Sequence, residues 1–284
     1  MDRDRQTRTG LVTALTFVAA LVVALVVRGG AVIGIAALFL LLVPLEKLFA
    51  LRPQRIFRRG LLTDLTHLLV NNLLVTAGTI ALVVVAAIPL LWVRALDVES
   101  LLSTGAAIAL AAVLAFVGQY WGHRLTHRVP FLWRFHAVHH SIEQMDWVAA
   151  GRLHPIDQAF TQAFTVLPLF VLGYDGGVFA GVAVFVTLLA LFQHANVRLR
   201  FPVVRWVINT PEWHHWHHAL DEEARDKNFG LPVVDKIFGT AYLPKGKRAT
   251  AFGTTSPVPQ DGYLSHLRYP FTKLARAPSI SVGD

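Results

Sequence analysis

Histidine is the residue type whose number and spacing in this chain most directly indicate chemistry. Of 13 histidines, eleven fall between His123 and His218. Eight of them form three motifs whose members lie three or four residues from the first, so in a helix they share one face. The motifs are His123 with His127; His136 with His139 and His140; and His214 with His217 and His218. Eight imidazoles can therefore converge on a common centre between facing helices.

Metal binding is the function that this concentration of imidazoles favours. Buried polar rings are costly without partners, and so many of them need a cation or a complete hydrogen-bond network. Eight neutral imidazoles exceed the four ligands of a tetrahedral zinc site and suit two ions with about four to five ligands each. Zinc, iron, copper and nickel all accept imidazole, so the spacing predicts a pair of metal ions without choosing the element.

Other polar residues are expected to complete or surround this centre. His154 and His194 stand at the two ends of an apolar hairpin, and we expect them to be the ninth and tenth ligands. His215 lies about 100° around a helix from its predecessor, so it should sit behind the ligands or face the substrate. Further candidates to hydrogen-bond the ligand rings are Asp146, Asn196, Asp226, Asn228 and Asp235. The two histidines outside this region, His67 and His266, are not expected to bind metal.

The elements that must position these residues are strongly apolar. Of the chain, 54% is hydrophobic and only 15% charged, and the mean hydropathy is +0.51, whereas soluble proteins have roughly 25% charged residues. This composition predicts a membrane protein. The absence of cysteine excludes disulfides, thiolate zinc sites and iron–sulfur clusters. The net charge of +8 is assigned to cytoplasmic loops, because no nucleic-acid-binding motif accompanies it.

Four apolar runs are long enough to cross a bilayer as helices. They are residues 11–27, 29–45, 61–93 and 101–117. The first two predict a hairpin that acts as an uncleaved anchor, and the third predicts one helix, tilted or kinked at Pro89. Two shorter runs, 159–172 and 178–192, predict a hairpin that crosses or re-enters the membrane with both ends on one side.

The basic loop between the second and third runs sets the orientation. It carries Lys47, Arg52, Arg55, Arg58 and Arg59 and should face the cytoplasm. Both termini and the metal site are then cytoplasmic, in an inner or plasma membrane. The predicted fold is an all-α integral membrane bundle of about four transmembrane helices plus the short hairpin, with a cytosolic helical cap that holds the dimetal site. We divide the chain into an N-terminal hairpin with the basic loop (1–60), a catalytic domain (61–250) and a C-terminal tail (251–284).

Six short motifs surround the histidines. They are W-G-H-R-L-T-H at 121–127, L-W-R-F-H-A-V-H-H-S at 132–141, R-L-H-P at 152–155, T-P-E-W-H-H-W-H-H at 210–218, N-F-G at 228–230 and D-K-I-F-G-T at 235–240. Together they resemble the fatty acid hydroxylase superfamily, which includes sterol desaturases, sterol C-4 methyl oxidases, sphingolipid fatty acid hydroxylases and alkylglycerol monooxygenase. The resemblance covers about residues 55–245.

The resemblance implies a non-haem di-iron oxygenase that uses O2 to hydroxylate or desaturate a C–H bond of a sterol-like, fatty acyl or ether lipid from the bilayer. The ligands it implies are His123, His127, His136, His139, His140, His154, His194, His214, His217 and His218. Two electrons would come from a ferredoxin, a cytochrome b5-like protein or a reductase, because the sequence has no haem motif or nucleotide-binding glycine loop.

Two other functions remain open from the residues alone. Zinc is an alternative metal in the isolated protein, and a zinc-dependent membrane hydrolase would differ from an oxygenase in its metal and in not requiring O2. The chain lacks the H-E-x-x-H motif that would supply a carboxylate base beside such a metal. A membrane metal-handling protein would be expected to place ligands within its spans, whereas these histidines gather on one side.

Overall fold

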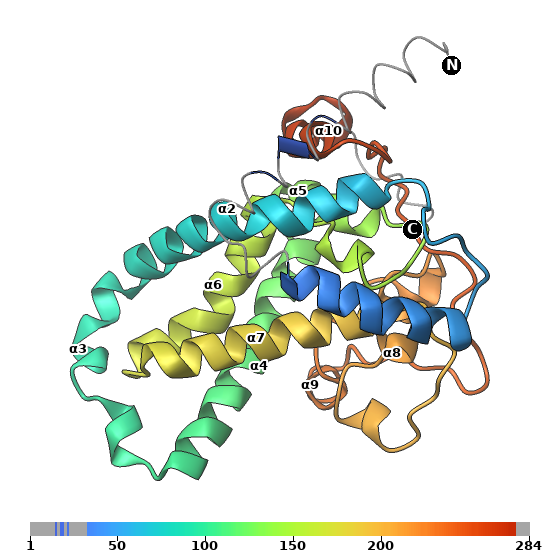
Figure 1. Ribbon diagram of the computed structural model, residues 1–284. Coiled ribbons are helices and arrows are strands. Elements are labelled where there is room, and N and C mark those ends of the chain that lie inside the picture. The colour runs from blue at the N-terminus through green and yellow to red at the C-terminus, as the bar shows by residue number, and fades with distance from the viewer. Residues whose placement is uncertain (1–14, 16–17, 20–21, 23–32, 277–284) are drawn as a thin grey trace.

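The computed structural model describes residues 15, 18, 19, 22 and 33–276 of the chain, and these are helical or irregular (Figure 1). Within them no β-strand forms, and two isolated bridges are the only β pairings. The first predicted run, 11–27, lies outside the described residues apart from those four positions. The second run is described from residue 33, where a helix continues to residue 48. The all-α prediction is therefore confirmed for the described part of the chain.

Four long helices lie beside one another and form the body of the molecule (Figure 1). They are α2 (Leu61–Ala87), α4 (Thr104–Arg128), α6 (Pro155–Val171) and α7 (Gly176–His194). Helix α6 contacts both α2 and α4 along its length, and α7 contacts α4. The short hairpin of the sequence analysis therefore consists of one helix inside the bundle, α6, and one at its surface, α7.

Small residues allow α6 to approach its neighbours closely. A Cβ atom added at Gly118 of α4 would lie 2.1 Å from the Phe164 carbonyl oxygen of α6, and one at Gly122 would lie 3.0 Å from the Phe164 Cβ. On the other side, a Cβ at Gly78 of α2 would lie 3.1 Å from the Ala159 Cβ. Such close contact between helices gains van der Waals energy where apolar burial alone provides little, as within a bilayer.

Three helical stretches are long and apolar enough to cross a membrane, and they identify an integral membrane protein. They are Leu74–Arg94, Thr104–Arg128 and Gly176–His194. The first joins the end of α2 to a 3-10 turn at Ile88–Leu90 and to the one-turn helix α3 (Leu91–Arg94). Pro89 lies in that turn, because proline cannot donate the helical hydrogen bond. The third run, predicted as one helix that is tilted or kinked at Pro89, is therefore a helical stretch with a 3-10 turn at that proline.

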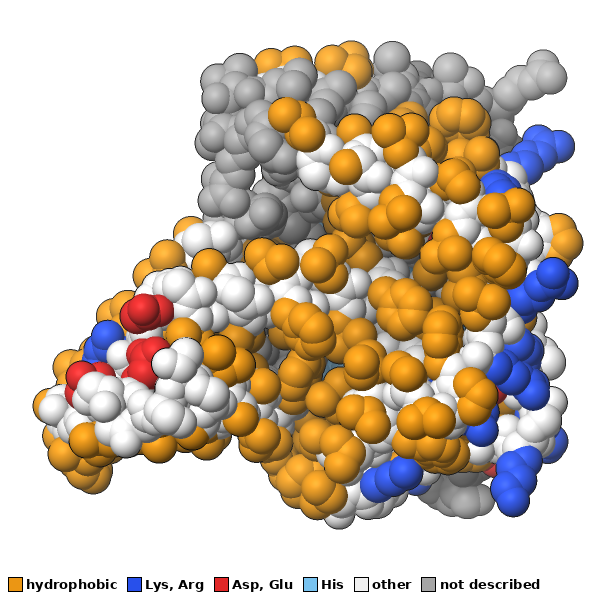
Figure 2. All heavy atoms as spheres, turned by 60° about the horizontal axis from the view of Figure 1, so that its bottom comes forward, with side chains coloured by type: hydrophobic (Ala, Val, Ile, Leu, Met, Phe, Trp, Pro, Cys, Tyr) orange, Lys and Arg blue, Asp and Glu red, His pale blue; other side chains and the backbone are white. Residues whose placement is uncertain are grey.

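Charge is distributed unequally over the surface of this bundle. Figure 2 shows hydrophobic side chains over much of the visible face, most of the visible Lys and Arg side chains along one edge, and a tip on the opposite side where acidic side chains gather beside a basic one. At the turn between α3 and α4, Glu99 accepts a hydrogen bond from the backbone N–H of Asp175 at 3.0 Å. The two inter-helical turns on that side are thereby held together.

Short helices at the other end of the bundle form a cap. They are α5 (Pro130–His140), α8 (Pro211–His217), α9 (Pro232–Ile237) and α10 (Tyr263–Arg268). The first three begin with proline, which is pre-organised for the first helical position and whose missing N–H is not needed there. Proline thus marks the start of α5 and α8, the cap helices that carry clustered histidines.

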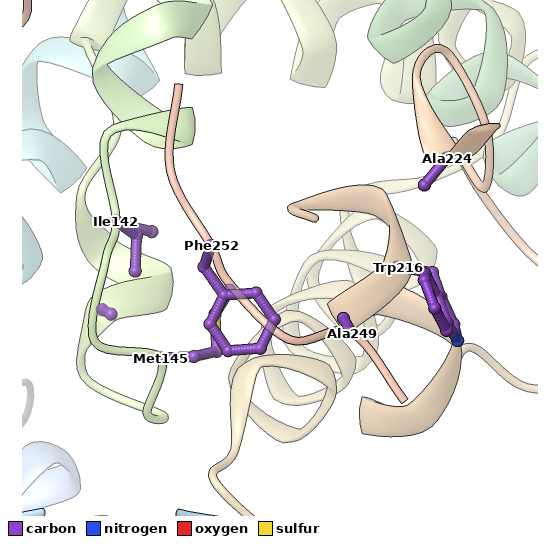
Figure 3. Packing of buried hydrophobic residues seen from close by; sticks show 7 residues of the cluster. Ile142, Met145, Trp216, Ala224, Ala249 and Phe252 are labelled. Carbon is purple, nitrogen blue, oxygen red and sulfur yellow. The ribbon is translucent and has the colours of Figure 1, made fainter. Parts of the chain in front are cut away.

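A buried apolar cluster fastens α8 to the segments that follow it. Trp216 of α8 packs with Ile142 and Met145 from the loop after α5, and with Ala249 and Phe252 from the C-terminal part (Figure 3). These residues are between 0 and 7% exposed. Residues just beyond 250 therefore pack against the histidine-bearing cap, and the domain boundary placed there stays a prediction.

Candidate metal centre

The structure brings nine histidines together in two groups. In each group, one ring nitrogen from every member lies within 4.8 Å of those of the others. The first group consists of His123, His127, His136, His140 and His217. The second consists of His139, His194, His214 and His218. Five and four ligands match the arrangement expected for two ions.

Helical geometry explains how one motif serves both groups. In α5, His136 and His140 are four residues apart and face the first group, while His139 faces the second. In the motif of α8 the division is reversed. One member, His217, faces the first group, and the other two, His214 and His218, face the second. The groups are adjacent, because the rings of His140 and His218 stack with centroids 4.5 Å apart.

Hydrogen bonds on the far side of the rings fix which nitrogen faces the centre. Four rings donate from Nδ1 to a backbone carbonyl oxygen: His123 to Phe229 at 2.7 Å, His139 to Arg152 at 3.2 Å, His194 to Ala190 at 2.7 Å and His217 to Lys227 at 2.8 Å. Because a carbonyl oxygen can only accept, Nδ1 carries the proton and Nε2 presents a lone pair.

These lone pairs point at one another. The Nε2 atoms of His139 and His194 are 3.2 Å apart, and both of these rings already donate from Nδ1. Two bare nitrogens cannot hydrogen-bond, so the contact is repulsive unless a cation lies between them. With metal–nitrogen bonds of about 2.0–2.1 Å, two ligand nitrogens on one ion lie roughly 3 Å apart. The donor set and its spacing therefore fit metal ions.

Burial keeps the cap histidines in the form that binds metal. Desolvation lowers the pKa of His139, His140 and His218 well below the ordinary value, and neighbouring imidazoles lower it further. The same burial lowers the pKa of His217 to about 3, although its bond to the Lys227 carbonyl opposes the shift. At neutral pH these rings are uncharged, as metal coordination requires.

Asp157 is a functional residue that sequence reasoning missed. Its carboxylate accepts a hydrogen bond from His136 Nδ1 at 3.0 Å and is 3% exposed. Asp157 lies on the first turn of α6, which begins in the R-L-H-P motif. The signal was available, because a buried carboxylate one turn into a helix that borders a metal site is a common partner for a ligand histidine.

Replacing Asp157 with asparagine should weaken metal binding by the first group about 10- to 100-fold, the usual effect of removing an outer partner of a ligand. An amide accepts more weakly than a carboxylate and no longer stabilises the orientation of His136. Competition with a chelator measures the effect. The control is Asp261→Asn, because Asp261 pairs with Arg59 at the surface. Equal metal affinity in both variants contradicts the role given to Asp157.

The predicted partners of the ligand rings divide into two sets. Asp226 lies with its Oδ1 3.4 Å from His127 Nδ1. Asp235 accepts the backbone N–H of Phe229 at 2.9 Å and thereby holds the carbonyl that orients His123; burial raises the pKa of Asp235 to about 6. Asn228 donates to the Trp213 carbonyl of α8 at 3.0 Å.

The other two pair with residues of the loop before α2. Asp146 pairs with Arg58 at 2.5 Å, and Asn196 hydrogen-bonds the backbone of Arg52. Both stabilise the loop that precedes α2 rather than the ligands.

Three of the remaining histidines lie outside both groups. His154 accepts a hydrogen bond from the N–H of Ile156 at 3.1 Å and caps α6, while its Nε2 lies 3.3 Å from the Leu267 carbonyl oxygen. Both of its ring nitrogens therefore have partners, which is a capping role. His67 and His266 contact each other, with His67 Nε2 2.9 Å from His266 Nδ1.

His215, the last of the thirteen, is buried beside the second group. Its ring lies against Phe252, with centroids 5.2 Å apart, and its Nε2 has no hydrogen-bond partner among the described residues. Burial lowers its pKa to about 3. The expectation that it sits behind the ligands agrees with this position.

Comparisons with known proteins bear on the same residues. The family model described as fatty acid hydroxylase matches residues 108–240. An ornithine lipid hydroxylase of Rhizobium tropici is 34% identical over 175 residues, which are 61% of this chain and 53% of that protein. The alkylglycerol monooxygenase of Homo sapiens is 32% identical over 143 residues, 50% of this chain and 31% of that protein.

A more distant relative has a different name. A very-long-chain aldehyde decarbonylase of Oryza sativa subsp. indica is 30% identical over 196 residues, 63% of this chain and 29% of that protein. The chain thus spans about half the length of the first of these relatives and less of the others. No solved structure matches it significantly. The family-model match contains all nine grouped histidines, and over residues 108–240 this chain is similar to the fatty acid hydroxylase family.

Proposed function

We propose that this chain is a membrane-bound di-iron oxygenase that oxidises a C–H bond of a lipid with O2. The observation that carries the proposal is the arrangement of nine histidines in two adjacent groups, together with the facing Nε2 lone pairs of His139 and His194. The relatives named as a lipid hydroxylase and a monooxygenase support oxygen chemistry and a lipid substrate. Nothing in either name favours hydrolysis or metal transport.

The overall reaction balances with two external electrons. For hydroxylation, a C–H bond, O2, two electrons and two protons give a C–OH group and water; for desaturation, two C–H bonds are lost and two waters form. When bound, a pair of iron ions supplies the activation of O2. The electrons come from a separate one-electron carrier or a reductase, such as a ferredoxin or a cytochrome b5-like protein.

The protein's own contribution is to hold the ligands and exclude water. Backbone carbonyls of Phe229, Arg152 and Lys227 fix the tautomers of their histidine partners. The Asp157 carboxylate does the same for His136, and the Asp226 carboxylate lies 3.4 Å from His127 Nδ1. Because these rings are oriented before any ion arrives, little reorganisation accompanies metal binding.

The orientation in the membrane follows from the charges. The loop before α2 and the cap carry most of the basic residues, whereas acidic side chains gather at the opposite tip (Figure 2). By the positive-inside rule, the cap with both histidine groups then faces the cytoplasm, where a soluble electron donor can reach it.

An isotope experiment tests this function. Full-length protein purified from iron-supplied cells is incubated with bilayer lipids, a reduced ferredoxin and isotopically labelled O2. The molecular masses of the lipids are then measured by mass spectrometry. A product with one labelled oxygen identifies hydroxylation, and loss of two hydrogens identifies desaturation. Lipid cleavage that proceeds with zinc and without O2 supports the hydrolase alternative and contradicts the proposal.

A further inference from the structure

A cavity lined mainly by the cap opens onto the first histidine group. Its volume is about 490 Å³, and His127, His140 and His217 line it. Ligand pockets usually measure roughly 300–1,000 Å³. His127 Nε2 is buried and has no hydrogen-bond partner among the described residues. A molecule in this cavity therefore touches the candidate ligands directly.

The rest of the lining comes from the cap and combines polar side chains with the apolar residues Pro130, Trp133, Ala219 and Leu220. Asp221, Glu222 and Arg225 line it from the segment after α8, and Thr254 and Thr255 line it from the C-terminal part. Of the lining residues, His127 alone belongs to a helix that is long and apolar enough to span the membrane. This route to the histidines can therefore hold a charged group together with the carbons next to it.

Some charged side chains of this lining have an oppositely charged partner in the protein, and others have none. Asp226 is engaged, because its carboxylate lies 3.4 Å from His127 and 3.7 Å from Arg128. Within residues 33–276, by contrast, the structure shows no ion pair for the side chains of Asp221, Glu222 and Arg225. The cavity thus presents two carboxylates and one guanidinium that are available to a ligand.

We propose that this cavity binds the zwitterionic headgroup of the lipid substrate. The headgroup's ammonium lies against Asp221 and Glu222, and its carboxylate or phosphate lies against Arg225, whose planar fork suits either anion. A neutral headgroup would leave all three charges unmatched. This inference rests on the proposed oxygenase function, and it places the oxidised C–H bond in the headgroup or on the carbons next to it.

Equilibrium binding of three lipids tests the proposal. The lipids share their acyl chains and carry an ornithine, a phosphoethanolamine or a glycerol headgroup. They are added to the full-length, metal-loaded protein in uncharged detergent, without an electron donor, so that no turnover occurs. We expect at least one zwitterionic lipid to bind about tenfold or more tightly than the glycerol lipid, because charged hydrogen bonds are the stronger ones. Tighter binding of the ornithine lipid indicates that the cavity prefers a carboxylate, and tighter binding of the phosphoethanolamine lipid indicates that it prefers a phosphate.

Matched variants locate the effect in the cavity. Arg225→Gln and the double variant Asp221→Asn, Glu222→Gln should each remove about tenfold of the zwitterion's affinity and leave the glycerol lipid unchanged. Glu223→Gln and Arg268→Gln are the controls, since both side chains are exposed and neither lines the cavity. Metal content equal to wild type verifies that each variant is folded.

The outcomes separate the headgroup proposal from the function on which it rests. Equal binding of all three lipids, or cavity variants that behave like their controls, overturns the headgroup proposal even if labelled oxygen enters a lipid. Selective binding that depends on Arg225 and the two carboxylates upholds the headgroup site even if the metal-loaded protein oxidises no lipid, which counts against the oxygenase function alone.

Discussion

Replacing His139 with alanine should remove one of two metal ions, and replacing its neighbour His140 should remove the other. The two residues are adjacent in α5 but belong to different groups. His139→Ala leaves three histidines in the second group, and His140→Ala leaves four in the first. Because loss of an outer partner already costs about 10- to 100-fold, loss of a ligand should reduce lipid oxidation by more than about 100-fold in both variants.

Elemental analysis per chain and product mass measure these effects. The matched control is His154→Asn, because His154 lies in neither group and asparagine retains the ability to cap α6. We expect this control to keep both metals and most of its activity. Loss of metal in the control, or full metal content in both α5 variants, contradicts the division into two groups.

Replacing Asp64 with alanine should have the largest effect on stability. Asp64 is fully buried and pairs with two arginines, Arg152 at 2.6 Å and Arg58 at 2.8 Å. Removing one partner of a buried ion pair costs about 3–5 kcal/mol, because the remaining charge stays buried without compensation. The carbonyl of Arg152 also accepts from His139, so the second histidine group should loosen as well.

The exposed ion pair of Arg59, the residue after Arg58, provides a comparison for the effect on stability. Arg59 pairs with Asp261 at 2.7 Å, but the Arg59 side chain is 69% exposed. Asp261→Ala should therefore change the free energy of unfolding by only about 0–1 kcal/mol. Unfolding in mixed micelles, followed for both variants, measures the difference. A similar small change for Asp64→Ala contradicts the importance of the buried network.

Helical spacing allowed the histidine sites to be predicted because it acts locally. Positions four apart in α4 and α5 share a face wherever those helices lie, so His123 and His127 had to be neighbours. The partition of each three-histidine motif between two groups was not predictable in the same way. It depends on how α5 and α8 are rotated relative to each other, which packing decides.

Features that depend on the path of the backbone could not be predicted from the sequence. The carbonyls of Phe229 and Lys227 orient two ligands. Because every residue has a backbone carbonyl, no residue type in the sequence marks these two. His154 has the sequence context of a ligand, but its position before Pro155 places it at the start of α6, where its Nδ1 accepts from the helix. Capping and coordination use the same ring nitrogens, and the sequence alone could not choose between them.

The fold was predictable to the extent that it follows hydropathy. The stretches Thr104–Arg128 and Gly176–His194 overlap the apolar runs 101–117 and 178–192, and the 3-10 turn at Pro89 follows from proline's chemistry. The central place of α6 was not predicted, because a helix buried among other helices and one facing lipid have similar composition. Gly118, against which α6 packs, gives the reason only once the contact is known.

Metal content per chain tests the central claim most directly. The full-length protein, purified in mild detergent from iron-supplied cells, is measured by elemental analysis together with iron spectroscopy on the same sample. Two histidine groups in contact predict two iron ions per chain that are magnetically coupled. A single ion per chain, or zinc that persists when iron is abundant, would contradict the di-iron centre and the oxygen chemistry assigned to it.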